Sequence, residues 1–128
     1  MPATLLAAAL VIASAGQAAR DQAVFTVGTA AARRGTLARG TIDVPAGVDA
    51  ALVIPVAVVH GAKPGPVLAI VSGAHGTEYA SIIAVERLIG ELDPAAISGT
   101  VILVPLVNVP SFRRRTSSLI CSIRRAMP

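Results

Sequence analysis

Apolar residues fall in short runs separated by turn-forming residues, which is typical of a chain built largely from strands. Residues 36–44 alternate loosely between apolar and polar positions, and residues 52–59 are rich in β-branched side chains. The segment between them, PAGVDA, has the composition of a turn. The pattern therefore predicts a β-hairpin or meander, and Pro55 favours an edge position or a bulge in its second strand.

A βαβ unit is predicted next. Residues 67–71 and 100–107 are short apolar runs of the kind expected for strands buried on both faces. Between them, residues 79–92 have apolar side chains at helical spacing, and Asp93-Pro94 ends the helix because a residue before proline disfavours helical geometry. The positions that define this spacing are Ile82, Val85, Leu88, Ile89 and Leu92. We therefore expect two parallel strands joined by a right-handed crossover.

The amino-terminal segment differs in composition from the rest. Residues 1–19 hold an apolar run followed by small residues, which predicts a signal peptide cleaved after Ala15 or Ala18. An alanine-rich segment that stays on the chain is the alternative. A used signal peptide would make the protein periplasmic or secreted, and without one it would be cytoplasmic. We expect no stable membrane span after cleavage, and a polar connection over residues 20–35.

Charge and cysteine content narrow the classes of partner. The sequence has 11 Lys and Arg against 7 Asp and Glu. The basic excess lies entirely after Phe112, in Arg113, Arg114, Arg115, Arg124 and Arg125. Although arginines contact phosphates, these lack interleaved aromatic residues and a nucleic-acid-binding motif, so we expect no nucleic-acid partner. The single Cys121 can form neither an internal disulfide nor a CxxC metal site.

The candidate chemistry lies in SGAHGTE, directly after residues 67–71. Ligands of open α/β sheets bind beyond the carboxyl ends of the strands. Gly73 and Gly76 let the backbone turn tightly and leave the His75 side chain unobstructed. A spacing of three residues on this turn lets an imidazole nitrogen of His75 and a carboxylate oxygen of Glu78 reach one point, and Zn²⁺ accepts both donors.

A structural explanation of the same two residues is also open. Glu78 would then be an acid at the start of a helix, where the helix dipole favours negative charge. His75 would be an ordinary polar loop residue. An isolated H-x-x-E pair does not decide between these two interpretations, because it is far less specific than H-E-x-x-H.

A longer stretch carries a family resemblance. Residues 63–112 have Gly-Pro before the strand, G-x-H-G-x-E at the turn, the helix, a Gly-Thr opening the next strand, and Pro-x-x-Asn-x-Pro-x-Phe after it. This order resembles the opening of the catalytic domain of the succinylglutamate desuccinylase/aspartoacylase family, which are zinc hydrolases. It implies an α/β fold class, namely a partial carboxypeptidase-like (zinc-exopeptidase-like) βαβ sheet preceded by a short β-hairpin or meander, over residues 36–112.

The resemblance also implies a site and a reaction. His75 and Glu78 would be ligands of a Zn²⁺ cofactor, and metal-activated water would cleave the amide bond of a small N-acyl amino acid-like substrate. Asn108 would lie near the substrate pocket or cap a turn, and one of the arginines at 113–115, here taken as Arg115, would bind substrate. His60 matches no ligand of the family, and we expect a loop histidine.

The resemblance is expected to stop after Phe112. The family would continue with an Asn-Leu-Asn-Arg stretch, a third zinc ligand and a general-base glutamate, whereas RRRTSSLICSIRRAMP contains no Asn, Asp, Glu or His. The hypothesis is a truncated family member, whose basic tail over residues 113–128 stems from a shifted reading frame or a faulty gene boundary. Zinc binding would be weak and activity little or none, and the unpaired edge of the sheet would favour aggregation.

Two other classes of function compete with this one. An exported noncatalytic binding domain would keep the fold and use its arginine-rich tail for anionic partners, and its polyanion binding would be salt-sensitive. A serine hydrolase has little support, because Ser72 and Ser81 lack a G-x-S-x-G elbow.

Overall fold

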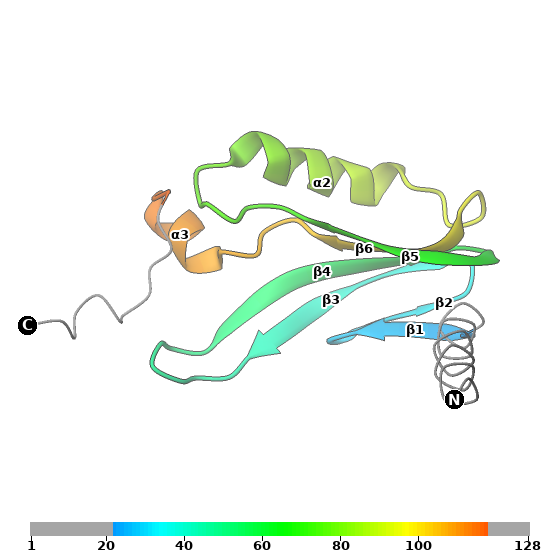
Figure 1. The fold of residues 1–128 in the computed structure, drawn as a ribbon, viewed down its shortest axis with the longest axis horizontal. Helices are drawn as coiled ribbons and strands as arrows, with labels where there is room; N and C mark the ends of the chain where they lie inside the picture. The colour runs from blue at the N-terminus through cyan, green and yellow to red at the C-terminus, as the bar shows by residue number, and fades with distance from the viewer. Residues whose placement is uncertain (1–21, 118–128) are drawn as a thin grey trace, which may run out of the picture.

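The structure, a computed structural model, describes residues 22–117 as three layers (Figure 1). Its elements are β1 (Val24–Val27), β2 (Ala30–Arg33), β3 (Thr36–Val44), β4 (Leu52–His60), β5 (Lys63–Val71), α2 (Tyr79–Glu91), β6 (Ser98–Val104) and α3 (Val109–Arg114). A four-stranded sheet of order β3-β4-β6-β5 forms the middle layer. Helix α2 covers one face, and the β1-β2 hairpin lies on the other (Figure 1).

The predicted hairpin of the third and fourth strands is confirmed. β3 and β4 pair antiparallel along their whole lengths. However, β4 is not an edge strand, because it also pairs with β6 from Ala57 to His60. Pro55 lies before this second pairing begins and is aligned only with Thr41 of β3. A proline cannot donate a ladder hydrogen bond, so it is tolerated in the half of β4 that has a single neighbour.

The βαβ unit is also confirmed. β5 and β6 are parallel, and the helix between them buries Ile82, Val85 and Ile89, as the apolar spacing predicts. The helix ends at Glu91, and Leu92 already has extended geometry before Asp93-Pro94. Because α2 connects the two parallel strands, the residues that follow β5 and β6 lie at the same end of the sheet.

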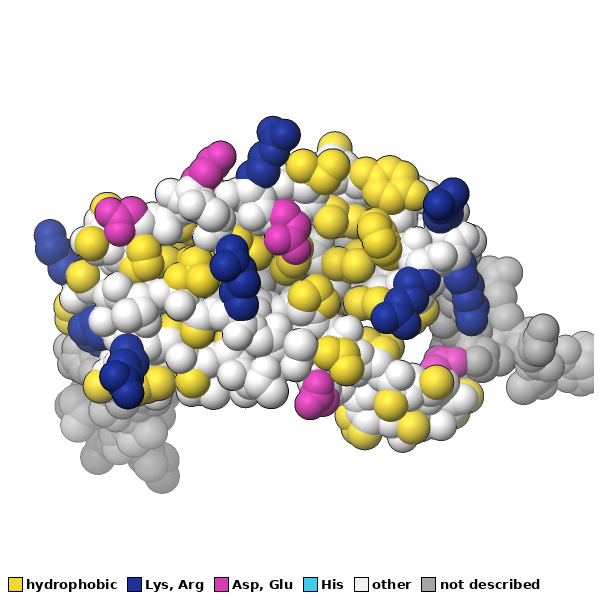
Figure 2. All heavy atoms as spheres, turned by 180° about the vertical axis from the view of Figure 1, so that it is seen from behind, with side chains coloured by type: hydrophobic (Ala, Val, Ile, Leu, Met, Phe, Trp, Pro, Cys, Tyr) yellow, Lys and Arg dark blue, Asp and Glu magenta, His cyan; other side chains and the backbone are white. Residues whose placement is uncertain are grey.

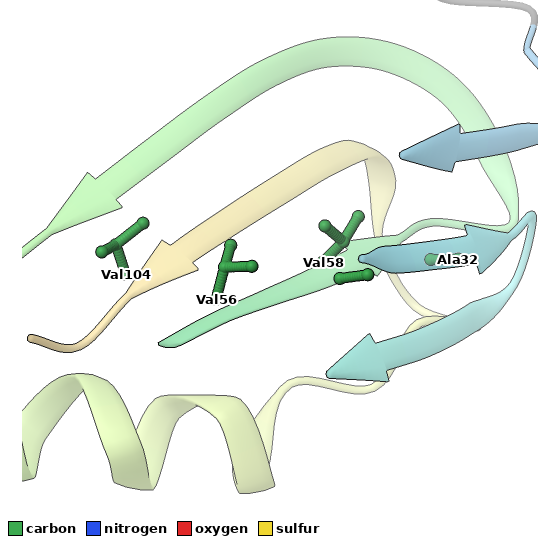
Figure 3. Close-up of a cluster of buried hydrophobic side chains, with 5 residues drawn as sticks. Ala32, Val56, Val58 and Val104 are labelled. Carbon is green, nitrogen blue, oxygen red and sulfur yellow. The ribbon is translucent and has the colours of Figure 1, made fainter. Parts of the chain in front are cut away.

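The core consists of two clusters, one on each face of the sheet. The cluster under the β1-β2 hairpin contains Ala30, Ala32, Val56, Val58 and Val104 (Figure 3). The cluster under α2 contains Ala57, Val59, Val85, Ile89 and Leu103. Successive side chains of a strand point to opposite faces, and therefore β4 and β6 are the strands buried on both faces.

β5 differs from the sequence prediction. Burial on both faces was expected for residues 67–71, yet Val67 is 43%, Leu68 55% and Val71 57% exposed. The reason is position: within the described sheet β5 lies at the edge and pairs only with β6. An apolar run favours a strand, but burial depends on which elements cover it. β5 therefore presents the unpaired apolar edge that the sequence led us to expect.

The polar connection predicted for residues 20–35 contains regular structure, because residues 24–33 form the β1-β2 hairpin. Buried and exposed positions alternate along β2. Ala30 and Ala32 are fully buried against the sheet. Their side chains are small enough for the hairpin backbone to approach closely, whereas a short alanine-rich run carries little hydrophobic signal in the sequence.

His60 is not a loop residue, because it ends β4 and is only 1% exposed. Its Nε2–H donates to the backbone carbonyl of Gln22 at 2.8 Å, since a carbonyl can only accept. Its Nδ1 lies 2.8 Å from the Thr100 hydroxyl, and its ring lies 5.9 Å from that of Phe25. His60 therefore ties the start of the β1-β2 hairpin to the sheet.

Several predictions fall on the ends of the chain. The structure does not describe the predicted signal peptide over residues 1–19. It also does not describe Cys121, Arg124 and Arg125. The first two arginines of the expected basic tail, Arg113 and Arg114, belong to α3. Between residues 22 and 117, no helix combines the length and the apolarity that crossing a membrane requires.

The burial of β6 and the exposure of β5 predict a contrast between two leucines. Leu103→Ala should lower the free energy of unfolding by about 2–5 kcal/mol, because Leu103 is fully buried and its truncation leaves a cavity. The matched control Leu68→Ala should cost less than about 1 kcal/mol, because its side chain is largely solvated already. Urea unfolding measures both, and similar losses would contradict this assignment of core and edge.

Candidate metal and substrate site

The site is built on the turn that follows β5. The Ser72 amide donates to the Val104 carbonyl at 2.9 Å, which extends the pairing with β6 past the end of the strand. Gly73 then adopts a φ of 66°, a left-handed conformation that glycine tolerates without steric cost. The Glu78 amide donates to the His75 carbonyl at 3.2 Å and closes the turn before α2. The turn thus presents His75 and Glu78 beyond the carboxyl end of β5.

The side chains of His75 and Glu78 converge, as the spacing predicts. His75 Nδ1 lies 2.8 Å from Glu78 Oε1, and the His75 backbone amide donates to Glu78 Oε2 at 3.3 Å. An ionised carboxylate can only accept, so Nδ1 carries the proton of this hydrogen bond. The side chains are 54% and 42% exposed, which leaves the pair accessible to ions and small molecules.

The structural explanation of Glu78 fits its place but not its side-chain contacts. Glu78 is the residue that precedes α2, yet its side chain makes no capping hydrogen bond to the helix. The carboxylate turns back toward His75 instead. Its backbone carbonyl accepts hydrogen bonds from the Ile82 amide and from the Ser81 hydroxyl. The backbone of Glu78 therefore begins the helix, while its side chain remains with the histidine.

The contact with His75 also changes the acidity of Glu78. The pKa of the Glu78 carboxyl is lowered from its ordinary value, chiefly by the hydrogen bond from the His75 side chain and then by the one from the His75 backbone amide. Partial desolvation opposes this effect but does not overcome it. Glu78 is therefore ionised at neutral pH, as a metal ligand must be.

Asn108 holds α3 against the turn. Its Oδ1 accepts from the Ser111 amide at 3.2 Å and caps the helix, while its Nδ2 donates to the Ala74 carbonyl at 2.9 Å. Its own backbone amide donates to the Gly73 carbonyl at 3.0 Å. The structure thus gives Asn108 the capping role considered from the sequence. It also places Asn108 beside the candidate pocket.

Gly76 completes this contact from the other side. A Cβ on Gly76 would overlap the backbone of Ser111 and Phe112, so only glycine permits α3 to lie this close. The Gly76 amide donates to the Thr116 carbonyl at 3.1 Å. Asn108, which precedes α3, and Thr116, which follows it, are therefore both hydrogen-bonded to the turn that carries His75.

A pocket of about 750 Å³ opens beside this contact. Three segments line it: residues 49–53 at the start of β4, Ala74 and His75, and residues 107–110 with Arg113 and Arg114. The start of α2, the loop before β4 and α3 gather at this end of the sheet (Figure 1). Arg115, the predicted substrate-binding arginine, does not line the pocket and instead ends α3 with a φ of 53°.

Among the lining residues, Asp49 was not singled out from the sequence, and Arg113 and Arg114 were named only as members of the set 113–115. Arg113 and Arg114 reach the pocket because α3 includes them, and a six-residue helix carries little periodicity to predict it. Asp49 reaches the pocket from the loop between β3 and β4, far earlier in the chain. Because β4 pairs antiparallel with β6, the start of β4 and the loop before it lie toward the carboxyl end of β6.

His75 and Glu78 are the two side chains in this part of the chain suited to hold a metal ion. An imidazole nitrogen and a carboxylate oxygen are donors that Zn²⁺ accepts. Among residues 22–117, no group of three or more His, Cys, Asp and Glu side chains lies together. The other histidine, His60, is aligned with Thr100 at the opposite end of β6 and is buried there. The described residues thus supply two donors.

The fit between Gly76 and α3 predicts a position-specific effect of one methyl group. Gly76→Ala should lower the free energy of unfolding by about 1–3 kcal/mol and shift the NMR resonances of Asn108, because the added Cβ must push α3 away. Gly47→Ala is the matched control, since nothing lies within 4 Å of a Cβ at Gly47. Unchanged Asn108 resonances in Gly76→Ala would contradict the contact.

The hydrogen bond between His75 and Glu78 predicts the acid titration of the metal-free chain. His75→Ala should raise the pKa of Glu78 toward its ordinary value, measured by NMR titration of the side-chain carboxyl carbon. Because the pKa of Glu78 is lowered in the folded chain, the pair stabilises the fold above the pKa of an unfolded glutamate. This contribution disappears as the pH falls through the lowered value. The same Glu78 titration in both proteins would rule out the hydrogen bond.

Comparison with known proteins places this geometry in a family. The profile of the succinylglutamate desuccinylase/aspartoacylase catalytic domain matches residues 64–126. The match includes the turn, α2, β6 and α3. The match also continues past Phe112 into the arginine-rich segment. The prediction that the resemblance stops after Phe112 is therefore wrong.

One curated relative and two solved structures agree with this match. The N-alpha-acetyl-L-2,4-diaminobutyric acid deacetylase of Halomonas elongata is 39% identical over 71 residues, which are 54% of this chain and 20% of that protein. An aspartoacylase family protein from Mesorhizobium loti superimposes with a TM-score of 0.61 at 27% identity. The product-bound ectoine utilization protein EutE (DoeB) from Ruegeria pomeroyi superimposes with a TM-score of 0.58 at 26% identity.

These relatives are longer than the present chain. Each superposition covers 74% of this chain and 29% of the solved structure. The profile, the curated relative and the two structures all point to the same catalytic domain. The chain therefore belongs to the succinylglutamate desuccinylase/aspartoacylase family, and its sheet is part of the carboxypeptidase-like α/β fold predicted from the sequence.

Proposed function

We propose that this chain forms part of a zinc-dependent amidohydrolase that releases the acyl group of a small N-acyl amino acid. The observation that carries the proposal is the convergence of His75 Nδ1 and Glu78 Oε1, 2.8 Å apart, beside a pocket that Arg113 and Arg114 also line. Two side chains of the donor types that zinc accepts thus lie next to a cavity that cationic groups also line. A carboxylate-bearing amide would fit both features.

The zinc ion would supply the activated water and polarise the scissile carbonyl. The chain's own part begins with the ligands. Glu78 is already ionised, and its carboxylate is oriented by the His75 backbone amide. His75 Nδ1 can bind a cation when the ring proton lies on Nε2, which is the other tautomer of the neutral imidazole. Metal affinity should weaken at acid pH, because protons compete with the cation for the Glu78 carboxylate.

The second contribution is orientation of the substrate. Arg113 and Arg114 line the pocket from α3, and guanidinium groups bind carboxylates through paired, charge-assisted hydrogen bonds. Asn108 ties α3 to the turn that carries His75. The distance between the carboxylate-binding groups and the metal donors is therefore set by a short, hydrogen-bonded contact. Such an arrangement would hold the acyl amide of the substrate toward His75.

His75 and Glu78 are fewer ligands than a catalytic zinc site uses. Catalytic zinc sites use three protein ligands and leave a position for water. Residues 22–117 supply His75 and Glu78, and the only other histidine of the sequence, His60, is buried at the far end of β6. We therefore expect weak zinc binding and little turnover by this polypeptide, as the sequence also predicts.

Zinc titration tests the proposed ligands. The chain should bind zinc with a stoichiometry of one, and His75→Ala or Glu78→Ala should weaken binding by at least about tenfold, because each removes a direct ligand. Isothermal titration calorimetry measures the affinity and the stoichiometry of the original chain and of both variants.

Glu86→Ala is the matched control, because it removes an exposed acid on α2 outside the pocket. It should leave zinc affinity unchanged. An equal loss of affinity in Glu86→Ala would show that zinc binds to surface acids in general. Failure of the original chain to bind zinc at millimolar concentration would refute the proposed role of the pair.

A further inference from the structure

The pocket beside His75 has apolar walls that the proposed reaction does not use. Residues 50–53, at the start of β4, form one wall, and Val109 and Pro110 contribute apolar groups from the start of α3. Seen from behind, this end of the molecule is hollowed between the body and a small lobe that carries many hydrophobic side chains (Figure 2). The lobe is the segment that joins β3 to β4 (Figure 1). Apolar groups therefore border one cavity from two separate segments.

Val53 is an exposed apolar side chain in the wall formed by β4. Ala57 and Val59 pack under α2, and side chains separated by an even number of residues lie on the same face of a strand. Val53 therefore lies on the face of the sheet that α2 covers. Whereas Ala57 and Val59 are buried there, Val53 is 51% exposed and borders the pocket. An apolar ligand group placed against Val53 would remove this surface from water, which favours binding.

The order of groups in an N-acyl amino acid indicates which part of it would meet this wall. In the proposed function, Arg113 and Arg114 on α3 hold the carboxylate, and the amide lies toward His75. The carboxylate and the acyl group are opposite ends of such a molecule, with the amide between them. The acyl group would therefore extend away from the arginines, toward the wall formed by residues 50–53.

The cavity has room for an acyl group larger than acetyl. Its volume is about 750 Å³, and sites of roughly 300–1,000 Å³ bind drug-sized ligands. An acetyl group would leave most of the β4 wall in water, whereas a longer alkyl chain would cover it. Each methylene group that leaves water adds to the affinity, so the wall favours the longer chain.

We propose that residues 50–53 form a subsite for an apolar acyl chain, with Val53 as a specificity-determining residue. The substrate class is then N-acyl amino acids whose acyl group is an alkyl chain of medium length, rather than an acetyl or a dicarboxylic acyl group. A second carboxylate would gain nothing from an apolar wall. This inference rests on the proposed function and adds a choice of acyl group to it.

The test compares ligands that carry an alkyl chain at different ends. N-hexanoylglycine carries it on the acyl group, its constitutional isomer N-acetylnorleucine carries it on the amino acid, and N-acetylglycine lacks it. Dissociation constants are measured by NMR titration without zinc, so that turnover does not interfere. N-hexanoylglycine should bind about tenfold more tightly than N-acetylglycine, which is the gain when roughly two added methylene groups leave water. N-acetylnorleucine should gain less than about threefold, because its chain lies beside the carboxylate.

Val53→Ser should weaken the binding of N-hexanoylglycine about threefold and leave that of N-acetylglycine unchanged, because it removes apolar surface from the wall. Val53→Ile keeps an apolar side chain and should keep the preference. Val48→Ser is the matched control, since Val48 belongs to the loop before β4, is 81% exposed and does not line the pocket. It should also keep the preference. NMR spectra of the free variants show that the fold is retained before the comparison is made.

The outcomes separate the two levels of the proposal. If none of the three ligands binds the original chain, the amidohydrolase assignment fails together with the acyl subsite. If N-acetylglycine binds and N-hexanoylglycine binds no more tightly, or if Val53→Ser keeps the full preference, only the subsite is overturned. The subsite is also overturned if N-acetylnorleucine gains as much as its isomer. Equal losses in Val48→Ser and Val53→Ser would overturn it too, because the alkyl chain would then bind exposed apolar surface in general.

Discussion

The contact between the glycine turn and α3 determines the geometry of the candidate site. Asn108 caps α3 and at the same time donates to the Ala74 carbonyl, so one side chain joins the end of β6 to the turn after β5. The absence of a Cβ at Gly76 permits the close approach of the α3 backbone. The proposed metal donors and the arginines that line the pocket lie in separate segments, and this contact holds the two segments together. A small shift of α3 relative to the turn would therefore change the position of the arginines relative to His75 and Glu78.

The two histidines show how the same residue type acquires different roles. His60 is buried, and both ring nitrogens have partners in the fold, so it joins the β1-β2 hairpin to the sheet. His75 is half-exposed and bonded to a carboxylate at the end of a strand, where ligands of α/β sheets bind. Burial with satisfied hydrogen bonds favours a structural histidine, whereas exposure beside an acid leaves the ring available for chemistry.

The sheet combines a stable centre with an exposed edge. β4 and β6 are buried between α2 and the β1-β2 hairpin, so they anchor the strand ends from which the site extends. β5 carries the turn with His75, yet it lies at the edge of the described sheet with apolar side chains in solvent. Within residues 22–117, the strand that supports the proposed metal donors thus pairs with β6 alone.

The sequence by itself determined the local elements and the pair of donors. The spacing of Ile82, Val85 and Ile89 predicted α2, the apolar runs predicted β5 and β6, and the turn motif predicted the meeting of His75 and Glu78. These features depend on neighbouring residues, so periodicity and turn chemistry are sufficient to predict them.

Only the tertiary structure decided which side chains are buried by distant segments and which residues line the pocket. The burial of Ala30 and Ala32 requires the sheet beneath them, and the exposure of Leu68 follows from the place of β5 at an edge. Asp49 reaches the pocket because β4 pairs antiparallel with β6, which brings the loop before β4 toward the carboxyl end of β6. The burial of the alanines, the exposure of β5 and the proximity of charges from distant segments depend on how the layers pack, and a local sequence pattern does not contain that information.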